Sequence, residues 1–203
     1  MEREYKWNIP PESLSAFAGY LHEAAGRLSH DIMQMAAVYY DTPDGMIHKI
    51  GGALRIRREN DRSVCCMKRT VRKEGALALR EEYETEAQTL KEGLEKLPDA
   101  GAPRDFCILL LHQEFQELGR TEFTRNCYLM EIREGAGFTA EFAFDVGALG
   151  LPGHMKHFEE LELEFKSGDA DAFTAYAEAL EKRFSLIPQR ASKLARAIAA
   201  AKE

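Results

Sequence analysis

The sequence lacks the features of several protein classes. It has no basic excess, because 27 Lys and Arg stand against 34 Asp and Glu in 203 residues, for a net charge of −7. General nucleic-acid binders carry net positive charge, so we expect no nucleic-acid partner. The longest apolar runs, Ile32–Tyr40 and Cys107–Gln113, fall far short of the roughly 20 residues that a membrane-spanning helix needs. The first residues contain no signal-peptide core, so we expect a cytoplasmic protein without a membrane partner.

Cysteine, glycine and proline also lack the excess that marks disulfide-rich, collagen-like or disordered chains. The four cysteines include the adjacent Cys65 and Cys66 but no C-x-x-C pair, which argues against a zinc site or a disulfide framework and favours buried thiols. Fifteen glycines and seven prolines, with 45% hydrophobic residues, exclude a collagen-like or disordered chain. We therefore expect an ordered globular protein with one domain over residues 1–203.

Hydrophobic periodicity and turn residues predict a chain of strands with a few helices. The expected strands are 2–8, 36–42, 53–59, 63–71, 78–87, 121–133, 138–146 and 158–166. The expected helices are 12–28, 169–184 and 190–202, together with 106–118, where a strand is the alternative. Most strands follow one another through short loops, which favours an antiparallel sheet or barrel with helices packed outside it. The predicted class is α+β.

Charged residues recur at every second position in these strands, so they share one face of each strand. They are Glu2, Glu4 and Lys6; Arg55 and Arg57; Lys68; Arg80, Glu82 and Glu84; Glu141 and Asp145; and Glu160, Glu162 and Glu164. For any single strand, a solvated outer face is the commoner explanation. When all the strands are considered together, the apolar stripes of the outer helices need the apolar faces of the strands to pack on. If the sheet closes into a barrel, the charged faces therefore point inward.

A lumen with both carboxylates and cations needs a ligand that satisfies both. Clustered carboxylates repel one another unless a cation lies among them, and hard divalent metals prefer oxygen ligands. Clustered Arg and Lys suit a polyanion, most naturally phosphate. The pattern therefore predicts a divalent metal together with a polyphosphate.

Several motifs carry a resemblance to a known family. They are Glu2-Arg3-Glu4-Tyr5-Lys6 (E-x-E-x-K), the segments 39–44 (YYDTPD), 54–57 (LRIR), 67–68 (MK), 80–83 (REEY), 123–125 (FTR), 144–147 (FDVG) and 160–164 (ELELE), and 192–196 (SKLAR). In this order they resemble the CYTH superfamily of triphosphate tunnel metalloenzymes. This superfamily includes inorganic triphosphatases, thiamine triphosphatases and class IV adenylyl cyclases.

The resemblance implies an eight-stranded antiparallel tunnel that binds a small triphosphate with Mg²⁺ or Mn²⁺. The implied metal ligands are Glu2, Glu4, Asp145, Glu160, Glu162 and Glu164. The implied substrate-binding residues are Lys6, Arg55, Arg57, Lys68, Arg80, Arg125, Lys193 and Arg196. Glu2, Glu4, Lys6 and Glu82 are the implied catalytic residues.

Three functions fit this set of residues. Hydrolysis of a small triphosphate ranks first, with inorganic triphosphate as the leading substrate, because no adenine-recognition element is evident. Cyclisation of ATP and hydrolysis of thiamine triphosphate are the alternatives. A polyphosphate-binding module without activity is disfavoured, because a pure anion binder gains little from clustered carboxylates.

Overall fold

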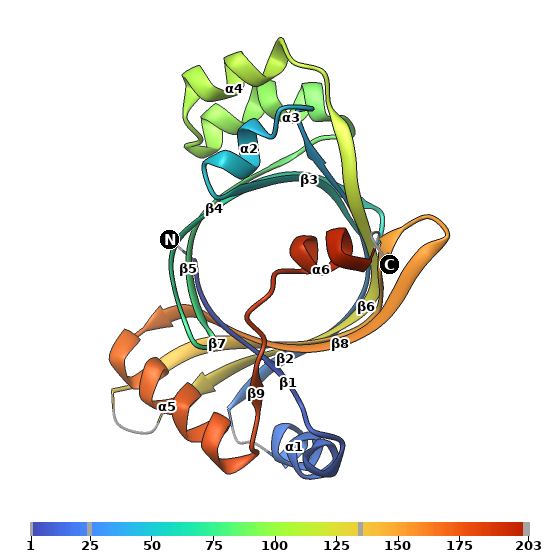
Figure 1. Cartoon of the computed structure of the whole chain (residues 1–203). Helices are drawn as coiled ribbons and strands as arrows, with labels where there is room; N and C mark the ends of the chain where they lie inside the picture. The colour runs from blue at the N-terminus through green and yellow to red at the C-terminus, as the bar shows by residue number, and fades with distance from the viewer. Residues whose placement is uncertain (1, 24–25, 134–135, 201–203) are drawn as a thin grey trace.

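Eight antiparallel strands close into a barrel in the computed structural model, which describes residues 2–23, 26–133 and 136–200 (Figure 1). The strands are β1 (Glu2–Asn8), β2 (Arg27–Asp41), β3 (Gly52–Glu59), β4 (Arg62–Glu74), β5 (Leu77–Glu86), β6 (Gln116–Ile132), β7 (Phe138–Leu151) and β8 (His154–Gly168). Their order is β5-β4-β3-β2-β6-β7-β8-β1, and pairing of β1 with β5 closes the ring. A two-residue strand, β9 (Ile187–Pro188), adds to β1. The predicted eight-stranded antiparallel barrel is confirmed.

Helices accompany this barrel, and all but the last pack outside it, as predicted for an α+β protein. They are α1 (Pro11–Glu23), α2 (Met46–Lys49), α3 (Leu90–Lys96), the 3₁₀ helix η1 (Leu97–Ala100), α4 (Arg104–Leu111), α5 (Ala170–Arg183) and α6 (Lys193–Ala200). α1 and α5 lie on one side of the barrel, and α2, α3 and α4 lie on the opposite side (Figure 1). α6 instead lies within the ring of strands, where Leu194 and Ile198 face the interior, so the prediction of a helix outside the barrel is wrong for α6. No helix among the described residues is long and apolar enough to span a membrane.

Two apolar cores hold the helices to the outer faces of the strands. Trp7, Phe142 and Leu163 from the barrel pack with residues of α1 and α5, including Phe173. On the other side, Leu54 and Cys65 pack with residues of α3 and α4. All four cysteines are buried and unpaired, as predicted. The apolar faces of the strands are therefore used by the helices, which leaves the charged faces for the interior.

The boundaries of several elements differ from the predictions. The helix predicted over 12–28 ends at Glu23, and Leu28 lies in β2, where it is 56% exposed. Gly26, just before β2, has a φ of 102°, a left-handed conformation that favours glycine, and its carbonyl accepts the backbone N–H of Glu131 in β6. The predicted helix 106–118 is also shorter, because α4 ends at Leu111 and β6 begins at Gln116. Backbone pairing of β6 with β2 outweighs local periodicity in both places.

The remaining differences are extensions and four short elements that were not predicted: α2, α3, η1 and β9. β7 and β8 continue to a tight turn at Pro152 and Gly153, beyond the predicted strands 138–146 and 158–166. The helix predicted over 190–202 is α6, and its predicted last residues lie outside the described residues. The short helix α2 follows the segment 39–44, which forms the end of β2 and the turn after it. Asp41, which is 2% exposed, accepts the backbone N–H groups of Thr42, Ile47 and His48 at 2.7, 2.9 and 2.9 Å.

Gly147 allows a close approach of β6 and β7. A Cβ at this position would meet Phe123 Cα at 2.5 Å, so we expect Gly147→Ala to lower the free energy of unfolding by about 3 kcal/mol. Gly19 in α1 is the matched control, because its added Cβ would meet no described atom within 4 Å. Gly19→Ala should stabilise by about 0.5 to 1 kcal/mol through its helix propensity. Urea denaturation measures both, and equal effects would contradict the prediction.

Candidate active site

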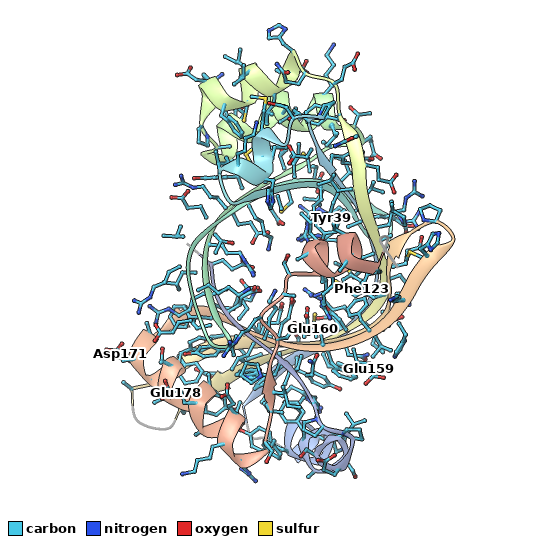
Figure 2. The ribbon with its side chains drawn as sticks, in the orientation of Figure 1. Tyr39, Phe123, Glu159, Glu160, Asp171 and Glu178 are labelled. Atoms are coloured by element: carbon cyan, nitrogen blue, oxygen red, sulfur yellow. The ribbon has the colours of Figure 1, made fainter. Side chains whose placement is uncertain are left out.

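The interior of the barrel is a charged cavity of about 660 Å³. Its walls carry eight carboxylates and eight lysine or arginine side chains, so the lining is balanced in charge although the chain is acidic. Figure 2 shows Glu160, Tyr39 and Phe123 inside the ring of strands and the neighbouring Glu159 outside it. Strand alternation therefore sends the charged faces inward. The predicted tunnel-facing carboxylates and cations converge on one chamber.

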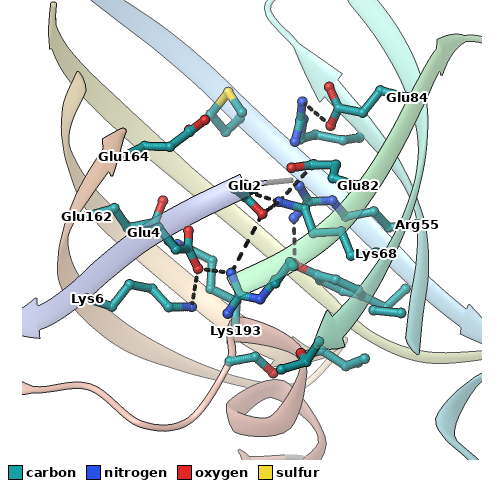
Figure 3. A pocket seen from close by; sticks show the side chains of 18 of the residues that line it. Glu2, Glu4, Lys6, Arg55, Lys68, Glu82, Glu84, Glu162, Glu164 and Lys193 are labelled. Atoms are coloured by element: carbon teal, nitrogen blue, oxygen red, sulfur yellow. Dashed lines mark hydrogen bonds and ion pairs between the residues drawn. The ribbon is translucent and has the colours of Figure 1, made fainter. Parts of the chain in front are cut away.

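Most of the predicted site residues line the cavity, and three others are not in its lining. The lining contains Glu2, Glu4, Lys6, Arg55, Arg57, Lys68, Arg80, Glu82, Arg125, Glu162, Glu164 and Lys193 (Figure 3). Asp145, Glu160 and Arg196 are not in the lining. Asp145 and Glu160 are fully buried, and both contact Lys193, which is in the lining. Arg196 pairs with Glu160.

The two glutamates of β1 are paired with cations from β1, β4 and β5. Glu2 accepts from Lys68 Nζ at 3.1 Å, and Lys68 also contacts Glu82 at 2.8 Å. Glu4 pairs with Arg80 and lies 3.4 Å from Lys6 Nζ. These contacts exist because β1 pairs with β5 and with β8 at the closure of the barrel. Neither Glu2 nor Glu4 lies in an acidic cluster in the described part of the chain.

Three carboxylates on β7 and β8 do form a cluster. One oxygen each of Asp145, Glu160 and Glu162 lies within 4.8 Å of the others. Asp145 and Glu160 face each other across the two strands. Arg125 makes two 2.7 Å hydrogen bonds to Asp145 and one of 2.5 Å to Glu162. We call Asp145, Glu160 and Glu162 the carboxylate cage.

The charges in and near the cage shift one another's pKa values. Burial alone would raise the pKa of Glu162, but Lys193, Arg125 and Lys6 hold it well below its usual value. Burial alone would lower the pKa of Lys193, but Asp145, Glu160 and Glu162 raise it. For Lys6, burial prevails and the pKa is lowered, although Glu160 and Glu162 oppose this. Glu162 is therefore ionised and Lys193 is protonated at neutral pH.

Glu164 stands apart from the cage. Its carboxylate contacts Lys166 at 3.0 Å, and Lys166 lies 3.5 Å from Glu141. Burial raises the pKa of Glu164, against the opposing effect of Lys166. The structure thus places this predicted metal ligand with Lys166, outside the cage.

Sequence reasoning missed several residues of the cavity wall. They are Glu59, Lys166, Met33, Met35, Tyr39 and Phe123. Strand alternation did place Glu84 and Glu141 on the charged faces, and both are in the lining, although neither was assigned a role. Cys66 also lies on the inner face, where its thiol donates to Glu82 at 3.3 Å, and burial raises its pKa to about 12. Cys66, Glu82 and Glu84 form a second group that could hold a metal.

Two guanidinium groups on β3 offer free donors within the barrel. Within the described residues, Arg55 Nε and Arg57 Nε are buried and have no hydrogen-bond partner. Arg55 also donates to Tyr39 Oη at 3.1 Å, while Arg57 contacts Glu84 at 2.9 Å. Buried donors without partners are costly, so a ligand oxygen at these nitrogens would be favourable. This wall of the cavity is suited to an anion.

A closed antiparallel barrel with carboxylates and cations facing inward defines a tunnel-shaped protein with a site for a charged ligand. The chain belongs to the CYTH domain family, whose model matches residues 1–198. It is 27% identical over 205 residues to the inorganic triphosphatase of Haemophilus influenzae. That match covers 96% of this chain and 53% of the relative, so the chain spans about half the length of the curated relative.

Solved structures share the fold at low sequence identity. The Hippeastrum protein HpAC1, described as a candidate adenylyl cyclase with a dominant triphosphatase activity, has a TM-score of 0.65 and 20% identity. The match covers 99% of this chain and 97% of that one. The PH1819 protein of Pyrococcus horikoshii has a TM-score of 0.56 and 19% identity, with 97% of each chain covered. These likenesses show the fold.

The family is metal-dependent, and the cage fits a hard divalent cation. Its three donors are carboxylate oxygens, which Mg²⁺ and Mn²⁺ prefer. Asp145 and Glu160 are buried and Glu162 is partly buried, so their charges need cations, a need that Lys193, Arg125 and Arg196 meet in this structure. The acidic groups of this chain could therefore hold a metal. The thiol of Cys66 makes the second group less suited to Mg²⁺.

Proposed function

We propose that this chain is a divalent-metal-dependent triphosphatase that hydrolyses a small triphosphate inside the barrel, with inorganic triphosphate, cleaved to phosphate and pyrophosphate, as the leading substrate. One observation carries the proposal: a cage of three carboxylates, two of them fully buried, lies beside a chamber whose wall carries buried arginine Nε donors with no hydrogen-bond partner among the described residues. The inorganic triphosphatase relative supports this choice of substrate class.

Each wall of the chamber has a proposed task. Arg55, Arg57 and Arg125 would hold phosphate oxygens in line by charge-assisted hydrogen bonds. Lys6, Lys68, Arg80, Lys193 and Arg196 would add positive charge around the phosphates. Glu82, which accepts a hydrogen bond from Cys66 and forms an ion pair with Lys68, is the proposed residue that orients the attacking water.

Mg²⁺ or Mn²⁺ would be held by Asp145, Glu160 and Glu162. Glu4 and Glu2, on the adjacent strand β1, and Glu164 complete the proposed ligand set. Such an ion supplies charge neutralisation at phosphate oxygens. A lining of equal positive and negative charges would hold a highly anionic triphosphate weakly without it.

The test is phosphate release by the purified chain from a panel of triphosphates. With Mg²⁺ or Mn²⁺, we expect phosphate and pyrophosphate from inorganic triphosphate, and EDTA should abolish the release. Thiamine triphosphate and ATP complete the panel, with products separated by chromatography. Cyclic AMP from ATP would instead identify a cyclase. Tight triphosphate binding without any product would identify a binding module.

Glu4→Gln should lower metal-dependent phosphate release at least about a hundredfold, because it removes a buried carboxylate that faces the chamber. Glu178→Gln is the matched control, since Glu178 lies on the exposed face of α5 (Figure 2). The control should retain full activity, and circular dichroism should show both variants folded. Wild-type activity in a folded Glu4→Gln protein would exclude Glu4 from the site.

A further inference from the structure

The ammonium group of Lys193 lies inside the carboxylate cage. Its Nζ is 2.8 Å from Asp145 Oδ2, 2.5 Å from Glu160 Oε1 and 2.8 Å from Glu162 Oε1. The cluster that could hold a metal ion consists of these same three carboxylates. One lysine, which is the first residue of α6, therefore already serves the three carboxylates as their shared cation.

Lys193 contacts all three carboxylates of the cage, whereas Arg125 contacts two of them and Arg196 contacts one, so a metal ion in the cage would compete first with Lys193. Metal ions of this class sit about 2.0 to 2.6 Å from carboxylate oxygens, closer than an ammonium nitrogen, and they use the same lone pairs. The side chain of Lys193 is 7% exposed, and those of Asp145, Glu160 and Glu162 are 0, 0 and 12% exposed. An ammonium beside a divalent ion in so buried a place would repel it strongly.

We propose that Lys193 and the divalent metal are alternative occupants of the carboxylate cage, so that metal binding expels the lysine side chain into the chamber. This inference rests on the proposed metal site. Lys193 lines the cavity, so its flexible stem can turn there without movement of α6. α6 keeps its other attachments, which are the pair of Arg196 with Glu160 and the packing of Ala197 and Ala200.

The exchange couples the two ligands of the site. Before metal binds, the charge of Lys193 is used by the cage and is unavailable to phosphate. After metal binds, the same charge is free in the chamber, next to the bound ion. Metal should then raise the affinity for triphosphate by more than its own charge provides, and triphosphate should raise metal affinity by the same factor.

Titration calorimetry with Mn²⁺ in the absence of substrate tests the exchange. Lys193→Met removes the competing cation, and we expect it to bind Mn²⁺ about tenfold more tightly than the wild type. Lys6→Met is the matched control, because Lys6 is equally buried and near the same glutamates, but its Nζ contacts Glu4. Lys6→Met removes one positive charge from the chamber but leaves Lys193 in the cage, so its Mn²⁺ affinity should rise clearly less than that of Lys193→Met.

The outcomes separate the two proposals. Equal or weaker Mn²⁺ binding by Lys193→Met, with binding retained in the wild type, would overturn the exchange and leave the metal site intact. Equal increases of Mn²⁺ affinity in Lys193→Met and Lys6→Met would mean that any loss of positive charge near the site strengthens metal binding, and this would also overturn the exchange. Absence of Mn²⁺ binding in every variant would overturn the metal site together with the exchange.

A second measurement uses the wild-type chain and does not depend on the folding of a variant. Acetylation by an amine-reactive ester, read by mass spectrometry, reports how far each lysine is exposed. Mn²⁺ should increase labelling of Lys193 at least about threefold, because the side chain leaves a buried cage. Lys182, exposed on α5, serves as the internal standard. Unchanged labelling at saturating Mn²⁺ would overturn the exchange.

Discussion

Glu162→Gln will lower kcat/KM for metal-dependent phosphate release by about a thousandfold. Glu162 belongs to the carboxylate cage and also lines the chamber, so it links the proposed metal to the substrate. Glutamine keeps the shape of the side chain but removes the negative charge that Lys193 and Arg125 now share. The measurement is steady-state kinetics with inorganic triphosphate at several Mg²⁺ concentrations.

The control comes from the same strand. Glu159→Gln changes an exposed carboxylate on the opposite face of β8, and it should leave kcat/KM unchanged and stability within about 0.5 kcal/mol (Figure 2). A folded Glu162→Gln protein with activity close to wild type would remove Glu162 from the proposed site. Partial recovery of the activity of Glu162→Gln at high Mg²⁺ concentration would agree with a loss of metal affinity in this variant.

Arg55→Met will lower kcat/KM by about a hundredfold. Arg55 Nε is a buried donor without a partner among the described residues, and Arg55 also donates to Tyr39. Methionine fills a similar volume without charge or hydrogen-bond donors. We expect most of the loss in kcat if the guanidinium acts on charge that develops during the reaction, and in KM if it only holds the substrate.

Arg58 is the matched control for Arg55. It lies on the same strand β3, is exposed, and follows the opposite alternation. Arg58→Met should keep the activity of the wild type. If the two variants lose activity equally, the inner wall of β3 has no special part in substrate binding, and the proposed anion site there is wrong.

Much of the barrel interior could be predicted from local pattern. The alternation of Glu2, Glu4 and Lys6, and of Glu160, Glu162 and Glu164, identified faces that the structure turns inward. Alternation is a property of the strand itself, so it needs no knowledge of neighbours. Where backbone pairing between strands competed with a local pattern, the prediction from the local pattern was wrong. Leu28, for example, was predicted as the end of a helix and lies in β2.

The pairing of charges could not be predicted in this way. Glu164 has the same alternation as Glu162, yet Lys166 holds it outside the carboxylate cage. Glu2 meets Lys68, 66 residues along the chain, because β1 pairs with β5 to close the barrel. Lys193 was expected to hold phosphate, and the structure places its ammonium among three carboxylates.

The sequence by itself determined the class of this protein: an α+β chain whose strands each have one charged and one apolar face, with family motifs in order. Those properties follow from residue type and spacing along one strand or helix. Tertiary structure alone decided which carboxylates form a cage, which cation occupies it and which arginine donors are left without partners. The reason is that Coulomb energies and hydrogen bonds depend on distances across the barrel, and only its closure sets them.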